Sequence, residues 1–384
     1  MTTKLACGLA ALVVALVSAC SGDADQLGQA TTSTRAITTA APRTEPASSV
    51  PAPNRPRAKQ VRAALDALPG GWSPLAFPRR HRASAVYLWT GRELFFWGGD
   101  TDNNAVNHAD GIVYDPFSDR WRQIPDAPIR GRTQAGGVGT GREALVWGGT
   151  TDRTLRALAD GAAFDPTTDT WRVLSESPLT PRIPLATVWT GTEMLVWGGR
   201  EWNSTTVDGA AYDPARDTWR RLPDSPLTMN RGTAVWTGAE MVVLGATVGD
   251  SGFDRHGRAM AYDPRADSWR VLPPYPFAGA ASTLVWTGQR ILAWDYEFRA
   301  AAYDPGRDAW RTMPGPPLDF YECEPSGVLV RRAVLAFSCG LTALRDERGW
   351  RPLPQPARIV WSPPVAAGPV VFVVGTRLWA YSVD

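Results

Sequence analysis

After residue 70, apolar, β-branched and aromatic residues occur in runs of about four to six, separated by short polar turns. One unit begins with Leu185–Trp189 and Glu193–Trp197, and continues after a polar loop with Gly209–Tyr212 and Trp219–Leu222. Runs of this length, punctuated by Gly, Pro and Asp, are typical of antiparallel strands joined by tight turns. Each unit is therefore predicted to form four short strands, and the fold class is all-β.

A longer pattern repeats along the same region: an aromatic residue, Asp and Pro, followed after a polar turn by Trp and Arg. Five clear copies contain the tryptophans Trp121, Trp171, Trp219, Trp269 and Trp310, which are 50, 48, 50 and 41 residues apart. A period of roughly 40–50 residues indicates a repeat architecture. With four strands in each unit, the repeat predicts a β-propeller, and it assigns these tryptophans to the scaffold.

Two further tryptophans decide the number of blades. Trp350 begins a sixth copy, and Trp72 has the position of a fourth strand without the first three. The missing strands are expected from Pro369–Val374 and Arg377–Tyr381 at the other end of the chain. An N-terminal outer strand would then close the ring and leave no open sheet edge. We predict seven blades, with six as the alternative.

Paired glycines after the second strand of a unit make the pattern more specific. They occur at positions 98–99, 148–149 and 198–199, while later units have Gly245-Ala246 and Trp294-Asp295. Double Gly, then an aromatic residue and a Trp at fixed separation, resembles the Kelch family of β-propellers, which belongs to the galactose oxidase central-domain-like superfamily. The resemblance covers about residues 70–384.

The N-terminal residues are similar to a bacterial lipoprotein signal. Lys4 precedes the apolar run Leu5–Ala19, whose 15 residues are short for a membrane span, and small residues lead to Cys20. We therefore expect a signal peptide over residues 1–19, lipidation at Cys20 and a disordered tether over 20–59, with the propeller over 60–384. An ordinary secretory signal with an incidental cysteine is the alternative. The expected location is the extracytoplasmic face of a bacterial cell membrane, reached through the lipid anchor alone.

The charge and the residue composition bear on the kind of partner, the source genome and the cysteines. The formal net charge is +2, and there is no basic run, so nucleic-acid binding is not expected. The basic residues are nearly all Arg, which favours a GC-rich genome such as that of an actinobacterium. Cys323 and Cys339 flank a hairpin-like stretch and are predicted to form a structural disulfide, because disulfides persist in exported proteins. We expect a monomer.

Binding is expected in the loops between the second and third strands, which are long in blades 1–4 and short in blades 5–7. Variable loops on a rigid scaffold are the usual place for a binding site. The loops run over Asp100–Asp110, Thr150–Asp160, Arg200–Asp208 and Thr247–Arg258. The candidate ligand-binding residues in them are Trp202, Asn203 and Arg255.

Arginines also recur before the first strands of blades 1–4, at Arg82, Arg132, Arg182 and Arg231. A ring of guanidinium groups at the mouth of the central channel would bind a carboxylate or another anion through bidentate hydrogen bonds. The alternative is that these arginines pair with loop aspartates or cap backbone carbonyls. The repeated Asp-Gly pairs at positions 110, 160 and 208 are interpreted as turn-setting residues and not as catalytic ones.

Some related propellers are enzymes. The copper site of the galactose oxidase family needs two His, two Tyr and a Cys, and this chain has only His81, His108 and His256, so that activity is excluded. Bacterial sialic-acid mutarotases of the Kelch type need no cofactor, and in such a reaction Glu201 or His256 would serve as acid or base. We expect a ligand- or protein-binding module for an anionic glycan or peptide, with no cofactor and no metal. The alternative is an isomerase, mutarotase or lyase acting on an acidic sugar.

Overall fold

The computed structural model describes residues 71–78, 82–101, 106–151, 156–201, 204–249, 252–277, 279–318, 325–338, 341–354, 363–374 and 377–383. All of them lie within the unit Ala52–Asp384. The signal peptide, Cys20, the tether and the Cys323–Cys339 pair lie outside the described residues. Within the described ranges, no helix has the length and apolar character needed to cross a bilayer.

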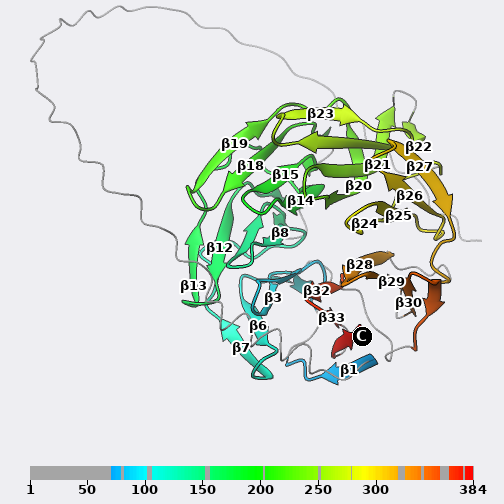
Figure 1. Cartoon of the computed structure of the whole chain (residues 1–384). Coiled ribbons are helices and arrows are strands. Elements are labelled where there is room, and N and C mark those ends of the chain that lie inside the picture. The colour runs from blue at the N-terminus through cyan, green and yellow to red at the C-terminus, as the bar shows by residue number, and fades with distance from the viewer. Residues whose placement is uncertain are drawn as a thin grey trace, which may run out of the picture. The chain divides into compact units, whose positions relative to one another are not determined.

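The described strands form seven four-stranded antiparallel sheets, the blades, arranged in a ring (Figure 1). Blade 1 consists of β2 (Val86–Trp89), β3 (Leu94–Trp97), β6 (Gly111–Asp115) and β7 (Arg120–Ile124). Blade 2 consists of β8 (Gly136–Gly139), β9 (Ala144–Trp147), β12 (Gly161–Asp165) and β13 (Thr170–Val173). Blade 3 consists of β14 (Ala186–Trp189), β15 (Met194–Trp197), β18 (Gly209–Asp213) and β19 (Thr218–Leu222).

The remaining blades keep the same meander with different strand lengths. Blade 4 consists of β20 (Met229–Trp236), β21 (Met241–Gly249), β22 (Gly252–Asp263) and β23 (Ser268–Val271). Blade 5 consists of β24 (Thr283–Trp286), β25 (Ile291–Trp294), β26 (Ala300–Asp304) and β27 (Ala309–Met313). Blade 6 consists of β28 (Ser326–Val330), β29 (Ala333–Ser338), β30 (Leu341–Asp346) and β31 (Gly349–Pro352). Blade 7 contains β32 (Val365–Ala367), β33 (Val370–Val374) and β34 (Leu378–Ser382).

The first strand of the described chain completes blade 7. β1 (Gly71–Leu75) pairs antiparallel with β34, with Trp72 opposite Tyr381 and Leu75 opposite Leu378. The sheet order is β1-β34-β33-β32, so the N-terminal strand is the outer strand of the last blade. The innermost strands of neighbouring blades contact one another around the ring, β32 and β2 included. The predictions of seven blades and of closure by an N-terminal outer strand are confirmed.

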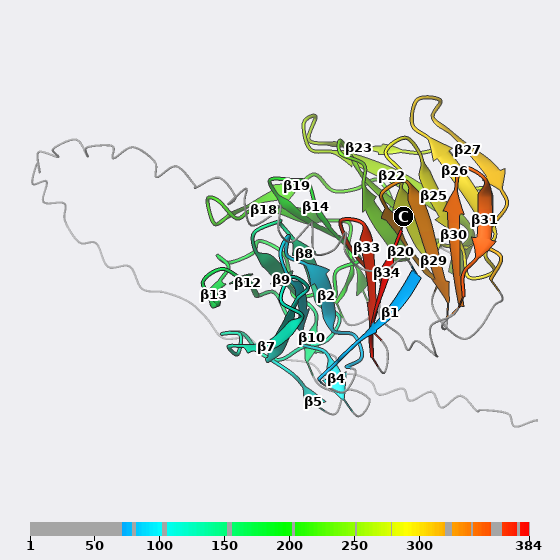
Figure 2. The ribbon, with the colours of Figure 1, turned by 60° about the horizontal axis from the view of Figure 1, so that its bottom comes forward.

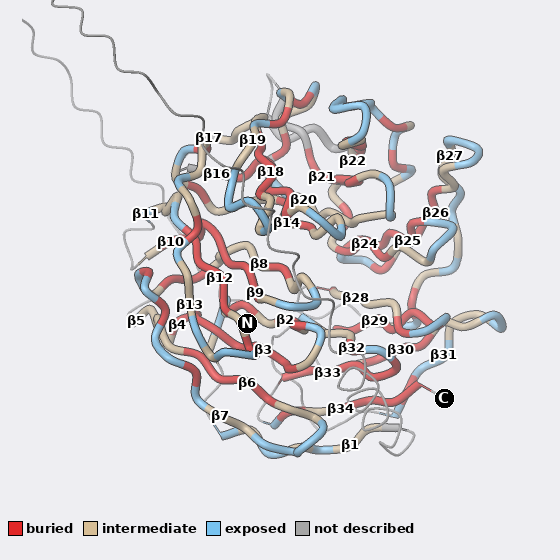
Figure 3. The backbone as a smooth tube through the Cα atoms, turned by 60° about the vertical axis from the view of Figure 1, so that its left-hand side comes forward, coloured by how far each residue is buried: buried red, intermediate tan, exposed pale blue. Residues whose placement is uncertain are grey.

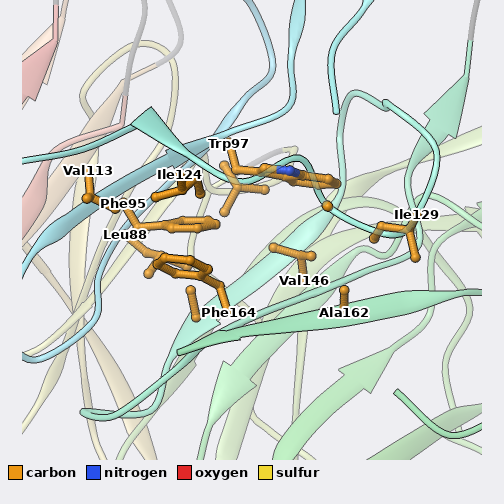
Figure 4. Close-up of a cluster of buried hydrophobic side chains, with 12 residues drawn as sticks. Leu88, Phe95, Trp97, Val113, Ile124, Ile129, Val146, Ala162 and Phe164 are labelled. Carbon is orange, nitrogen blue, oxygen red and sulfur yellow. The ribbon is translucent and has the colours of Figure 1, made fainter. Parts of the chain in front are cut away.

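The hydrophobic core is divided among the joints between blades. Seven clusters of buried side chains are present in the described part of the chain, and each combines residues of two neighbouring blades. At the joint of blades 1 and 2, Phe95 and Trp97 pack with Val146 and Phe164 (Figure 4). Burial follows the middle strands of the blades, whereas an outer strand such as β7 is only partly buried (Figure 3). Blade-to-blade packing is thus the main source of apolar stabilisation.

The repeated Trp and Arg add polar bonds across the same joints. The indole of Trp219 donates a hydrogen bond of 3.0 Å to the carbonyl oxygen of Ser175 in the preceding blade. Arg220 pairs with Glu193 of its own blade at 2.8 Å and donates to the hydroxyl of Tyr262 in the next blade at 3.0 Å. These contacts account for the conserved spacing of Trp, Arg and Tyr within each unit. They place the repeat in the scaffold, as the sequence predicted.

Candidate functional site

Hairpins project from one side of the ring at four consecutive blades. In blades 1–3 the second and third strands are connected through two-stranded hairpins, which are β4 (Asp100–Thr101) with β5 (Val106–Asn107), β10 (Thr150–Thr151) with β11 (Arg156–Ala157), and β16 (Arg200–Glu201) with β17 (Ser204–Thr205). In blade 4, β21 and β22 themselves extend into a longer hairpin. Figure 2 shows β4, β5 and β10 together beyond the body of the blades. We call this side of the ring the hairpin face.

The hairpin face is uneven around the ring, as predicted. In blade 5 the corresponding connection runs only from Trp294 to Ala300, and in blade 6 only from Ser338 to Leu341. The connections that enter blades 1–3 lie on the same side, because Ala83, Thr133 and Ile183 each form an isolated bridge to the first residue of a hairpin. The face therefore combines two kinds of loop over blades 1–4.

The paired glycines hold the base of each hairpin against the next blade. Gly98 and Gly99 have φ values of 71° and 79°, a region that favours glycine. The N–H of Gly99 donates to the carbonyl oxygen of Arg132, which enters blade 2, at 2.9 Å. The N–H of Gly149 donates in the same way to Arg182 at the next joint. The position of each hairpin is thus fixed by its neighbour.

The side chain of Arg132 is completely buried and turned into its own blade. Its Nη1 and Nη2 donate to the two carboxylate oxygens of Asp160 at 2.8 and 3.0 Å. Nη1 also donates to the carbonyl oxygen of Gly148 at 3.2 Å, and Nε donates to that of Arg130 at 2.9 Å. All of these donors are occupied by groups of the protein. This is the ion-pairing and carbonyl-capping alternative considered for the arginine repeat.

Arg182 and Arg82 repeat the arrangement in blades 3 and 1. Arg182, also buried, donates to both carboxylate oxygens of Asp208 at 2.6 and 3.1 Å. Burial by itself would raise the pKa of Asp208, but the hydrogen bonds and charge of Arg182 outweigh it and hold that pKa below its usual value. Arg82 pairs with Asp110 at 2.8 Å. The structure therefore does not present these three guanidinium groups as an open ring.

The same contacts revise the interpretation of the Asp-Gly repeat. The carboxylates of Asp110, Asp160 and Asp208 each bind the arginine that precedes the first strand of their own blade. Their backbone carbonyls accept hydrogen bonds from the first glycine of each pair. Each aspartate therefore connects the start of a third strand with the segment that enters the blade. Its regular position reflects the regular position of its arginine partner.

Arg231 differs from the other three predicted arginines. It lies in β20, is exposed, and forms no ion pair or hydrogen bond that involves its side chain within the described residues. Blade 4 has Arg258 at the position that Asp208 takes in blade 3, so the carboxylate partner is missing there. The charge of Arg231 is available on the hairpin face.

Three more arginines share these properties and were not among the predicted site residues. Arg130 lies in the connection that enters blade 2, Arg156 in β11 and Arg200 in β16. All three are exposed, and none forms an ion pair with the part of the chain that the structure describes. The sequence distinguishes the paired arginines from the exposed ones. Arg82, Arg132 and Arg182 each have an aspartate 26 to 28 residues later, within the same unit.

Several predicted residues are not placed by the structure. Trp202 and Asn203, and the side chains of Glu201, Arg255 and His256, lie outside the described part of the chain. Their roles stay predictions. Among the residues that are described, no group of three or more His, Cys, Asp and Glu side chains is arranged to hold a metal ion.

One comparison with known proteins identifies a family. The model of the KLHDC2/KLHL20/DRC7 Kelch-repeats domain matches residues 80–293. The match spans blades 1–4, including every arginine and aspartate of the hairpin face discussed above, and ends within β25 of blade 5. No curated protein matches the chain.

Proposed function

The chain belongs to the Kelch-repeat family of β-propellers, and from this premise we propose that it is a protein-binding module whose partner docks on the hairpin face of blades 1–4. A propeller with this repeat is in general a protein-binding module. The observation that carries the location is the set of hairpins at four consecutive blades, next to short connections in blades 5 and 6. Rigid blades beneath variable loops favour recognition by the loops.

We propose further that the recognised segment of the partner is acidic. Arg130, Arg156, Arg200 and Arg231 are exposed on the hairpin face without a carboxylate partner among the described residues. A guanidinium group binds a carboxylate through two parallel hydrogen bonds, which gives both affinity and orientation. Exposed charges of one sign also accelerate encounter with an oppositely charged segment, and salt weakens that effect. An anionic glycan would offer the same charge with different geometry.

Binding of a labelled hexaglutamate peptide to the full chain tests this proposal by fluorescence anisotropy. We expect affinity to fall with rising salt and to fall about tenfold or more when Arg156→Glu and Arg200→Glu are combined. The matched control combines Arg265→Glu and Arg307→Glu, because both arginines are exposed in turns between the third and fourth strands of their blades, on the opposite side of the ring. A heparin oligosaccharide tests the glycan. Equal loss with the control variant, or no binding of the peptide, contradicts the acidic-segment proposal.

We also propose that the protein is held by a lipid at the extracytoplasmic face of a bacterial membrane. The support is the sequence around Cys20, where Lys4, a short apolar run and small residues precede the cysteine. A diacylated cysteine provides two chains, which suffice for stable anchoring. Cell fractionation tests this: the chain should be recovered with membranes, and Cys20→Ala should release it. Membrane recovery that is unchanged in Cys20→Ala contradicts the proposal.

A further inference from the structure

The hairpin face continues into blade 5 with a short loop, Asp295–Arg299, which connects β25 with β26. The N–H groups of Glu297 and Arg299 donate to one carboxylate oxygen of Asp295, each at 3.0 Å. The N–H of Phe298 donates to the carbonyl oxygen of Asp295, also at 3.0 Å. The Nε of Arg299 donates to the second carboxylate oxygen at 2.7 Å. The buried carboxylate of Asp295 therefore organises the whole loop.

Phe298 fixes the other end of this loop. Its φ is 58°, and it is the one apolar side chain among the described non-glycine residues with a positive φ. Its ring is buried between blades 5 and 6 together with Trp294 and Val334. Gly315 lies so close that a Cβ atom there would be 1.8 Å from the carbonyl oxygen of Phe298. A backbone conformation of this cost persists only where the surroundings enforce it, so the loop is rigid.

The rigid loop exposes two side chains, Tyr296 and Glu297, at its central positions. Tyr296 is 40% exposed, and the side chain of Glu297 is 68% exposed. Within the described residues, the carboxylate of Glu297 pairs with Arg299 alone, at 3.4 Å. That guanidinium is bound more closely by Asp295, at 2.6 Å. The two carboxylates of the loop outnumber its one guanidinium, so the loop carries an excess of negative charge.

This charge is opposite to that of the neighbouring part of the hairpin face, where exposed arginines lack a carboxylate partner among the described residues. The two regions are continuous, because blades 4 and 5 are neighbours in the ring (Figure 1). The N–H of Tyr275, in the connection that enters blade 5, donates to the carbonyl oxygen of Gly257 in blade 4 at 3.3 Å. Phe277, in the same connection, has its ring centre 5.3 Å from the guanidinium of Arg299. The hairpin face therefore changes from basic to acidic between blade 4 and blade 5.

We propose that Tyr296 and Glu297 bind a basic side chain of the protein partner, an arginine or a lysine, while the acidic segment of the same partner lies over the arginines of blades 2–4. The inference rests on the proposed function and adds a second point of contact to it. A cation is attracted both by the face of a tyrosine ring and by a carboxylate. A loop that is already rigid loses little freedom on binding. Charges of both signs on one face also select the direction in which the partner segment lies.

Labelled peptides test this contact on the full chain by fluorescence anisotropy. Each has six glutamates, a spacer of three glycines, and then either two arginines or two glutamines. A second pair with the reverse order covers both directions of the segment. The arginine peptides have the lower negative charge, so the arginines of the hairpin face alone would bind them more weakly. We expect instead that, in one of the two orders, the arginine peptide binds about threefold more tightly than the glutamine peptide.

Tyr296→Ala combined with Glu297→Gln should abolish this preference, and Glu297→Gln alone replaces the pair if the double variant does not fold. The matched control combines Phe117→Ala with Glu347→Gln, because both side chains are exposed in turns on the opposite side of the ring, and it should keep the preference.

Arginine peptides that bind no more tightly than the glutamine peptides in either order would overturn the contact and leave the acidic-segment proposal standing. Binding of none of the peptides would overturn both. A preference that survives in the folded loop variant, or that is lost equally in the control, would overturn the blade 5 loop as its site.

Discussion

The indole Nε1 of Trp121 donates a hydrogen bond of 2.7 Å to the carbonyl oxygen of Ala76. Ala76 follows β1 directly, so this bond ties the outer strand of blade 1 to the outer strand of blade 7. Five other joints have the same bond, always to the carbonyl four residues after the preceding tryptophan. At the joint of blades 6 and 7, the Nε1 of Trp72 has no partner in the described part of the chain. Comparing one of the six bonded tryptophans with Trp72 therefore measures how much this hydrogen bond contributes to the stability of the fold.

Trp269→Phe is expected to destabilise the fold more than Trp72→Phe. Both changes remove similar packing, but only Trp269 also loses a hydrogen bond, of 2.9 Å to Pro223, which contributes about 1 kcal/mol. Urea unfolding of the two variants measures the difference in free energy. Equal losses would show that the indole bond contributes nothing at these joints.

Breaking the ion pair between Arg132 and Asp160 should destabilise the fold more than removing an exposed arginine. Asp160→Asn leaves the buried guanidinium without its carboxylate partner; because the Asp160 side chain is itself 45% exposed, we expect a loss of about 1.5–3 kcal/mol, the usual range for hydrogen bonds to a charged group. Arg156→Ala serves as the comparison, because that side chain is exposed and has no ion pair among the described residues. Thermal unfolding compares both with the parent chain. A loss below about 1 kcal/mol for Asp160→Asn would contradict the structural role of the pair.

Acid should weaken the fold through the aspartates that bind arginine and tyrosine. Burial tends to raise the pKa of Asp208 and Asp217, but Arg182 and the Tyr212 hydroxyl, respectively, reverse this and lower both values. An aspartate whose pKa is lower in the folded than in the unfolded chain stabilises the fold at pH values above its unfolded-state pKa. This stabilisation is lost as the pH falls through about 4 and below.

The variant Asp208→Asn tests how much Asp208 contributes to the pH dependence of the free energy of unfolding. Urea unfolding between about pH 6 and pH 3 should show a shallower decrease for Asp208→Asn than for the parent chain, although the variant is less stable at neutral pH. Identical slopes would mean that Asp208 has the same pKa in the folded and unfolded chain.

Gly139→Ala should prevent normal packing of the inner ring. A Cβ atom on Gly139 would lie 1.9 Å from the carbonyl oxygen of Trp89 in the neighbouring blade, so two backbones would have to separate. Overpacking of this kind costs about 1–3 kcal/mol or more. Gly306→Ala is the control, because its added Cβ meets nothing nearer than an Asp304 side-chain oxygen at 3.4 Å. Circular dichroism during heating should show a lower midpoint only for Gly139→Ala.

The propeller scaffold could be predicted from the sequence because the residues that specify it recur at regular positions. Trp72 and Trp350 continued the series of tryptophans, and the missing strands of the last blade stood at the other end of the chain. Loop lengths also indicated which side of which blades would carry hairpins. Each of these features depends on strand order alone, which a periodic pattern reports directly.

The partners of the arginines were harder to predict, because they depend on the direction of a side chain. Arg132 and Asp160 both recur at fixed positions, yet the pattern does not say whether the guanidinium turns into its own blade or toward the channel.

Closure through β1 and β34 also sets the order in which the molecule can be finished during synthesis. Gly71–Leu75 leaves the ribosome before any other described strand, and its partner Leu378–Ser382 leaves last. Blades 1–6 have all their own strands before that moment, whereas blade 7 must wait for β34. A ribosome that stops a few residues early would therefore release a ring that cannot close, with its first strand unpaired.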